Sequence, residues 1–91
     1  MSATAGNRGG LVVTLYGREA CHLCDEAREA LVRISGEGWP FEFEEVDIES
    51  DPELHRRLLE RIPVIEIGGE VVGELFIDED AVRARLDTLS A

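Results

Sequence analysis

The spacing of hydrophobic residues changes along the chain, and these changes mark the predicted elements. Residues 11–16 form a continuous run of apolar and β-branched residues, typical of a strand buried on both faces. After Gly17 and a short loop, residues 21–35 repeat with helical spacing, which predicts an amphipathic helix. The predicted buried stripe of this helix consists of Leu23, Ala27, Ala30, Leu31 and Ile34.

A second strand and a second helix are expected next. Residues 41–46 alternate aromatic and acidic side chains, which indicates a strand. Asp51 followed by Pro52 has the composition of a helix N-cap and first turn, so a short helix is predicted within 49–60. This helix must end before Pro63, because the residue before a proline avoids the helical region.

The last third of the chain predicts a hairpin and a helix. Residues 62–67 and 70–73 are strand-like and flank Gly68-Gly69, a pair typical of a two-residue hairpin turn. Residues 75–77 are apolar and are expected to bury a corner of the fold. Asp78 is expected to cap a final helix.

These elements predict one α/β domain over residues 11–91, preceded by a flexible tail at 1–10. The order is β-α-β-α-β-β-α. A right-handed crossover makes the first two strands parallel, and the hairpin adds an antiparallel edge. The expected fold is a three-layer α/β/α sandwich around a four-stranded mixed sheet.

Charge and composition exclude several classes of partner. The 91 residues carry a formal net charge of −11, which disfavours nucleic acid and anionic membranes. No apolar run approaches the roughly 20 residues that span a bilayer. The N-terminus lacks the hydrophobic segment of a signal peptide, so a cytoplasmic location and a reducing environment are expected.

The chemistry is concentrated in Cys21-His22-Leu23-Cys24, which contains both cysteines of the chain. A C-x-x-C pair between a strand and a helix indicates a dithiol/disulfide motif. The helix N-terminus favours a thiolate at Cys21, and Cys24 lies near enough to attack a mixed disulfide there. A protonated His22 beside Cys21 would stabilise the thiolate further. The alternative for His22 is an exposed side chain without influence on the sulfur.

The order of elements, with C-x-x-C after the first strand and Ile62-Pro63 before the third, resembles the minimal thioredoxin fold and, within it, the glutaredoxins. Residues 15–27 are similar to the opening of small bacterial glutaredoxin-like proteins, and the resemblance extends over 11–89. It implies that Cys21 is the nucleophile and Cys24 the resolving cysteine. It also implies a cis peptide bond at Pro63, where Ile62 offers its backbone to an extended substrate.

The resemblance has a further implication and two departures. Arg18 matches a basic residue that glutaredoxins place near the glutathione carboxylate; the alternative is a solvent-exposed loop arginine. Glutaredoxins usually carry Pro-Tyr where this chain has His22-Leu23. The glycine pair and hydroxyl that bind glutathione before the last helix are missing here, which weakens the expectation of glutathione binding.

The resulting hypothesis is a small monomeric thiol–disulfide oxidoreductase with a role in cell redox homeostasis. It would reduce or exchange protein or glutathione disulfides, and a disulfide reductase would be a further partner. The candidate site comprises Cys21 and Cys24 as catalytic residues and, as substrate-binding residues, Arg18, His22, Ile62 and Pro63. No bound cofactor is expected, and glutathione enters as a co-substrate.

Two alternatives stay open. Cys21, His22 and Cys24 are soft metal ligands, although a structural zinc site requires four ligands. A zinc or iron–sulfur site of this kind would have to be shared with a second chain, and no metal ligands are assigned within the chain. The other alternative is a thioredoxin-fold interaction module with redox-inert cysteines.

Overall fold

The computed structural model describes residues 11–39 and 41–90. The elements in chain order are β1 (Leu11–Gly17), α2 (His22–Ser35), β2 (Phe41–Asp47), the 3₁₀ turn η1 (Ile48–Ser50), α3 (Pro52–Leu58), β3 (Val64–Ile67), β4 (Glu70–Glu74) and α4 (Glu79–Ser90). The predicted order of strands and helices is confirmed. The tail expected at 1–10 lies outside the described residues.

The four strands form one mixed sheet in the order β2-β1-β3-β4. β1 pairs parallel with β2 and antiparallel with β3, and β4 pairs antiparallel with β3. Gly68 and Gly69 both have positive φ, 61° and 85°, which is the conformation that a tight two-residue hairpin turn requires. The register shifts between Ile65 and Glu66, so Val72 is an extra residue on β4 and forms a bulge.

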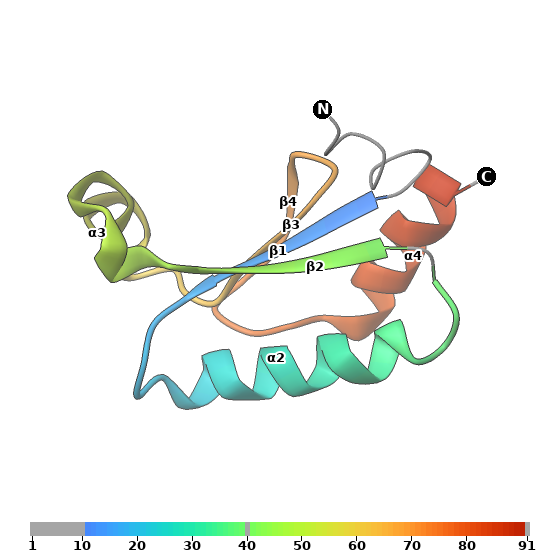
Figure 1. The fold of residues 1–91 in the computed structure, drawn as a ribbon, viewed down its shortest axis with the longest axis horizontal. Helices are drawn as coiled ribbons and strands as arrows, with labels where there is room; N and C mark the ends of the chain where they lie inside the picture. The colour runs from blue at the N-terminus through green and yellow to red at the C-terminus, as the bar shows by residue number, and fades with distance from the viewer. Residues whose placement is uncertain (1–10, 40, 91) are drawn as a thin grey trace.

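The helices cover the sheet unequally (Figure 1). α2 and α4 lie on the same face of the sheet, where Leu15 of β1 is buried in the larger hydrophobic cluster. Tyr16 points to the other face, because successive side chains of a strand alternate. There it packs in a smaller cluster with Leu54 and Leu58 of α3. The predicted three layers are confirmed, with the short α3 as the whole of the third layer.

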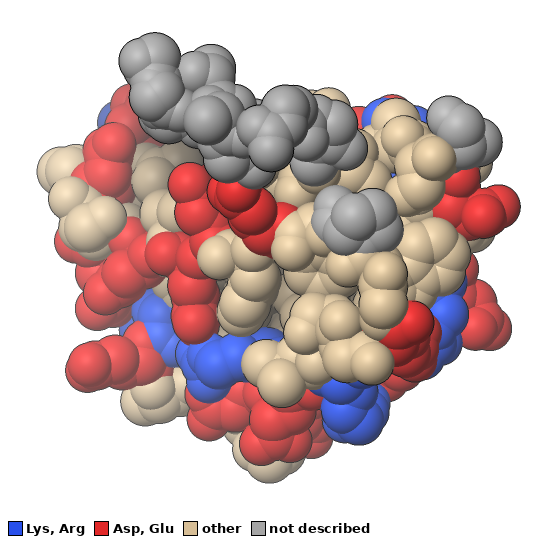
Figure 2. Space-filling model, turned by 45° about the vertical axis from the view of Figure 1, so that its right-hand side comes forward, with Lys and Arg blue, Asp and Glu red and all other residues tan. Residues whose placement is uncertain are grey.

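Ion pairs hold α2 and α4 together at the surface. Arg83 binds the Glu37 carboxylate at 2.7 Å and the Glu79 carboxylate at 3.3 Å, and Arg33 binds Glu79 at 2.6 Å. Figure 2 shows acidic side chains over much of one face, with arginines among them. In the described part of the chain, no helix has both the length and the hydrophobicity needed to cross a membrane.

One predicted segment is confirmed and one is wrong. The short helix predicted within 49–60 is α3, with Asp51 as its N-cap and Pro52 in its first turn, and the extended Asp51, with φ −146° and ψ 117°, separates it from η1. Residues 75–77 do not bury a corner, because Leu75 is 50% exposed and Phe76 is 63% exposed. The Leu75 N–H donates to the carbonyls of Arg61 and Pro63. These two hydrogen bonds hold the loop in a conformation that leaves the side chains of Leu75 and Phe76 exposed to solvent.

Candidate active site

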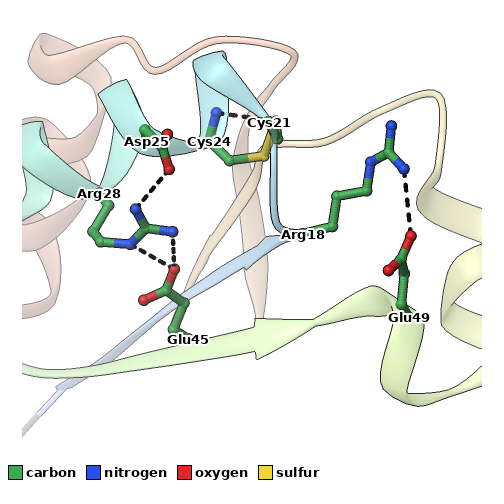
Figure 3. Close-up of a disulfide and its surroundings, with 7 residues drawn as sticks. All are labelled: Arg18, Cys21, Cys24, Asp25, Arg28, Glu45 and Glu49. Carbon is green, nitrogen blue, oxygen red and sulfur yellow. Dashed lines mark hydrogen bonds and ion pairs between the residues drawn. A yellow bond between two sulfur atoms is a disulfide. The ribbon is translucent and has the colours of Figure 1, made fainter.

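The two cysteines lie at the N-terminus of α2 and form a disulfide, with their Cα atoms 5.1 Å apart (Figure 3). Cys21 is the N-cap residue of the helix. Its Sγ accepts a hydrogen bond from the backbone N–H of Cys24 at 3.1 Å. The sulfur therefore occupies the place where an N-cap side chain usually satisfies a free N–H group, and it receives the positive end of the helix dipole.

The two sulfurs differ in exposure. Cys24 is fully buried and packs with Ile48, Ile62 and Val64. Cys21 is only half-buried and lies at the border of the same cluster. A partner molecule therefore has access to the disulfide from the side of Cys21.

Four of the five residues predicted for the buried stripe of α2 are buried, namely Ala27, Ala30, Leu31 and Ile34. The first turn differs, because Leu23, predicted to be buried, is 43% exposed and Cys24 is fully buried. Leu23 and Cys24 lie four and three residues before Ala27, so helical spacing alone allows either of them on the buried side. The packing of Cys24 in the cluster of Ile48, Ile62 and Val64 decides which one is inside.

Gly17 is a site residue that the sequence analysis treated only as the end of a strand. A Cβ at this position would lie 2.9 Å from Cys24 Sγ, closer than real Cβ atoms approach other atoms, and 3.1 Å from Cys24 Cβ, which is also unusually tight. The lack of a side chain at Gly17 is therefore what allows Cys24 to pack against the end of β1. A glycine between a strand and a C-x-x-C loop was the available signal.

Arg18 is close to the disulfide along the chain, but its guanidinium is directed elsewhere. It donates to the Glu49 carboxylate at 3.3 Å, and the side chain remains 42% exposed. Figure 3 shows the side chain reaching away from the disulfide toward Glu49. In this structure Arg18 therefore links the loop before Cys21 to η1.

His22 interacts along its own helix. Its Nε2 lies 2.8 Å from the Glu26 carboxylate, one turn further on, and the side chain is 84% exposed. The imidazole is thus in solvent and next to an acid. This exposed i,i+4 pair contributes little to stability.

The Ile62-Pro63 peptide bond is cis, as the family resemblance implied. Ile62 is buried and belongs to the same cluster as Cys24. Its backbone N–H donates to the Leu58 carbonyl at 3.1 Å, so this group is already used within the chain. The Pro63 carbonyl accepts from Leu75 at 2.9 Å, which joins the proline loop to the segment after β4.

A cavity of about 280 Å³ opens at the carboxyl ends of β1 and β2. Its lining consists of Gly17, Arg18, Glu19, Arg28, Glu45, Val46 and Asp47. Arg28 spans it, donating to Glu45 at 2.7 Å and to Asp25 at 2.8 Å (Figure 3). The hydrogen bonds to Glu45 and then to Asp25 raise the pKa of Arg28 above its ordinary value. Arg28 thus ties the first half of α2 to the edge strand β2.

Within residues 11–39 and 41–90, no group of three or more His, Cys, Asp or Glu side chains is arranged to hold a metal ion. A metal at the two cysteines would need further ligands from another molecule.

Comparison of the sequence with known protein families identifies the family of this chain. The sequence model of the glutaredoxin-like domain (DUF836) matches residues 12–87. A comparison with curated proteins gives no significant match.

Among solved structures, protein XcR50 from X. campestris is similar, with 36% identity and a TM-score of 0.67, over 84% of this chain and 96% of that one. Protein Ne2328 from Nitrosomonas europaea has 31% identity and a TM-score of 0.68, over 82% of this chain and 89% of that one. A mutant thioredoxin from Halobacterium salinarum has 18% identity and a TM-score of 0.67, over 98% of this chain and 81% of that one. This last likeness concerns the fold alone. The chain belongs to the glutaredoxin-like (DUF836) family and has a thioredoxin fold with a Cys21–Cys24 pair at the start of helix α2.

Proposed function

We propose that this protein is a thiol–disulfide oxidoreductase that uses Cys21 as nucleophile and Cys24 as resolving cysteine. The observation that carries the proposal is the asymmetry of the pair. Cys21 caps α2, receives the Cys24 N–H and is the more accessible sulfur, whereas Cys24 is fully buried behind it. A thiolate is the attacking species in disulfide exchange, and a helix N-terminus favours it.

The reaction proceeds in two exchanges. The Cys21 thiolate attacks one sulfur of a substrate disulfide, a Cys21–substrate bond forms, and the other substrate sulfur leaves as a thiolate that takes up a proton. Cys24 loses its proton and attacks Cys21 Sγ, forming the Cys21–Cys24 disulfide and releasing the second substrate thiol. Two electrons pass from the dithiol to the substrate. An external thiol such as glutathione, or a disulfide reductase, returns the pair to the dithiol.

The polar groups near the pair have secondary roles in this proposal. Arg18 and His22 are close to Cys21 along the chain, but each side chain lies next to a carboxylate, Glu49 and Glu26 respectively. Neither of these pairings involves the cysteines. The main support for a Cys21 thiolate is the helix N-terminus, which acts at hydrogen-bond distance.

The test is to equilibrate the protein in glutathione buffers of graded potential, trap the free thiols and count them by mass. We expect a two-electron transition between a dithiol and an intramolecular disulfide. Accumulation of a glutathione adduct on Cys21 would indicate that glutathione itself is a substrate. Two free thiols under strongly oxidising buffer would contradict the proposal. Zinc content and visible absorbance of the purified protein test the metal-binding alternatives on the same sample.

A further inference from the structure

A cavity of about 110 Å³ lies beside α3, on the face of the sheet opposite α2 and α4 (Figure 1). Its lining comes from α3 and the turn that follows it, from Tyr16 on β1, and from strands β3 and β4. Neither cysteine lines it, and the proposed thiol–disulfide exchange uses none of its residues. The cavity is therefore a second candidate site, separate from the cysteine pair.

One part of the cavity lining is apolar. Leu58 and Val64 are buried, Leu54 is half-buried, and all three pack in the smaller hydrophobic cluster. Val71 of β4 completes this part of the lining, and it is 46% exposed. An apolar cavity of about 150 Å³ is large enough for benzene, so this smaller cavity suits a branched aliphatic group. Covering Val71 with such a group would remove apolar surface from water.

Charged side chains of opposite sign line the two sides of the cavity. Arg57 and Arg61 come from α3 and the turn after it, and Glu66 and Glu74 come from β3 and β4. Arg61 pairs with Glu74 at 3.6 Å. Within residues 11–39 and 41–90, neither Arg57 nor Glu66 forms an ion pair. The helix thus offers the cavity a cation, and the sheet offers it a carboxylate, that no described residue neutralises.

The Tyr16 hydroxyl, which also lines the cavity, is sensitive to both of these charges. It donates to the Glu66 carboxylate at 3.2 Å. Burial and then Glu66 raise the pKa of Tyr16, and the Arg57 guanidinium lowers it. A bound molecule that pairs with either charge should therefore change the environment of this phenol.

From the apolar lining and the two unpaired charges we propose that this cavity binds a free α-amino acid with a branched aliphatic side chain, such as valine. The ligand carboxylate pairs with Arg57, its ammonium group pairs with Glu66, and its side chain covers Val71. A zwitterion gives each of the two protein charges a partner, and charge-assisted hydrogen bonds are among the stronger ones. A simple carboxylate would bring a second negative charge to Glu66, and a simple amine would bring a second positive charge to Arg57.

The test is a titration of the full-length, isotope-labelled protein, followed by the backbone amide shifts of the residues that line the cavity. L-valine is compared with three compounds that each lack one part of it. Isovalerate lacks the ammonium group, isobutylamine lacks the carboxylate, and glycine lacks the side chain. We expect saturable shifts with L-valine and at least about tenfold weaker binding of each of the three, because each leaves one contact of the cavity unmade.

Two substitutions distinguish the two charges. Arg57→Gln should weaken the binding of L-valine about tenfold and leave that of isobutylamine unchanged, because only the carboxylate loses its partner. Glu66→Gln should also weaken the binding of L-valine about tenfold, but it should not weaken that of isovalerate. Arg56→Gln is the matched control, because Arg56 is a neighbouring exposed arginine that pairs with Glu53 and does not line this cavity. It should bind all four compounds as the wild type does.

Three results would each overturn the proposal. The first is that L-valine causes no saturable shift at the cavity. The second is that isovalerate or isobutylamine binds as tightly as L-valine, which would mean that the site does not recognise a zwitterion. The third is that Arg57→Gln binds L-valine as tightly as Arg56→Gln does. The titration requires no thiol–disulfide exchange, so its outcome is independent of the proposed redox function.

Discussion

Two hydrophobic clusters divide the interior of this protein, and they differ in composition and exposure. The large cluster lies between the sheet and helices α2 and α4, and its nine buried residues are all aliphatic. The small cluster lies where β1 ends and α3 begins, and its five buried residues include Cys24. Three half-buried side chains border the small cluster, those of Tyr16, Cys21 and Leu54.

The difference indicates a division of roles. The large cluster buries most of the apolar surface and is expected to supply most of the hydrophobic stability. The small cluster holds one sulfur in the interior and leaves the other within reach of solvent. Helix α2 belongs to both, because Leu31 and Ile34 pack in the large cluster and Cys24 in the small one. The large cluster therefore fixes the helix that presents the disulfide.

The largest expected effect comes from replacing the sulfurs in the small cluster. Cys21→Ser should abolish disulfide exchange, because it removes the accessible nucleophile. Cys24→Ser should leave the first exchange intact and trap a mixed disulfide at Cys21. Mass spectrometry of each variant after mixing with a peptide disulfide measures both results. A Cys21→Ser variant with wild-type activity would show that the roles are assigned wrongly.

Truncating one fully buried residue in each cluster should show whether the two clusters contribute differently to the free energy of unfolding and to the reduction potential of the cysteine pair. Leu31→Ala in the large cluster and Ile48→Ala in the small one should each lower the free energy of unfolding by about 2–5 kcal/mol. Only Ile48→Ala should also shift the reduction potential of the pair, because Ile48 packs in the cluster that contains Cys24. A tenfold change in the dithiol–disulfide equilibrium corresponds to about 30 mV.

Urea unfolding and glutathione titration measure the two quantities on the same samples. Equal shifts of potential in both variants would mean that the clusters act as one unit, and the division of roles would then be wrong.

A smaller effect is expected from adding one methyl group at the end of β1. Gly17→Ala should cost about 1–3 kcal/mol of stability, because the new Cβ would lie against Cys24. The oxidised protein should also become easier to reduce, since the variant displaces Cys24. Gly73→Ala is the matched control, because a Cβ there meets its nearest neighbours at 3.5 and 3.6 Å, ordinary contact distances. Thermal unfolding of both variants in oxidised and reduced form checks this prediction.

Tyr16, at the border of the small cluster, is expected to make stability depend on alkaline pH. Burial, and then the nearby Glu66 carboxylate that accepts from its hydroxyl at 3.2 Å, raise the pKa of Tyr16. A folded-state pKa above the unfolded value of about 10 means that the neutral phenol stabilises the fold below that pH, and that this contribution is lost as the pH rises through the folded pKa.

The measurement is urea unfolding of the wild type and of Tyr16→Phe across this pH range. The decline with pH should be shallower in Tyr16→Phe. Tyr16 is the one tyrosine of the chain, so the tyrosinate absorbance of the wild type reports this group directly. A tyrosinate that appears at the unfolded value would contradict the prediction.

The smallest effect is expected for the exposed Arg18–Glu49 pair. Glu49→Gln should lower the free energy of unfolding by less than about 1 kcal/mol, because side chains in solvent gain little from pairing. The difference from the wild type should shrink further at high salt, where exposed charges are screened. Urea unfolding at low and high ionic strength measures it, and a loss that persists in high salt would show that the pair is more than a surface contact.

The sequence alone was sufficient for the order of elements and for the position of the cysteine pair. Strand, turn and cap signals are local, so the run at 11–16, the Gly68-Gly69 turn and the Asp51 cap each predict their own structure. The family resemblance supplied the cis bond at Pro63. None of these inferences requires knowledge of what lies across the core.

Only the tertiary structure decided which side of each element is buried and what the site residues contact. Packing against the small cluster turned Cys24 inward and left Leu23 in solvent. Contacts between distant segments drew Arg18 to Glu49 and anchored Leu75 to Pro63. Helical spacing leaves the boundary of a buried stripe uncertain by one residue, and a run of apolar residues does not say whether it meets a core or a partner. Both depend on contacts between residues far apart in the sequence.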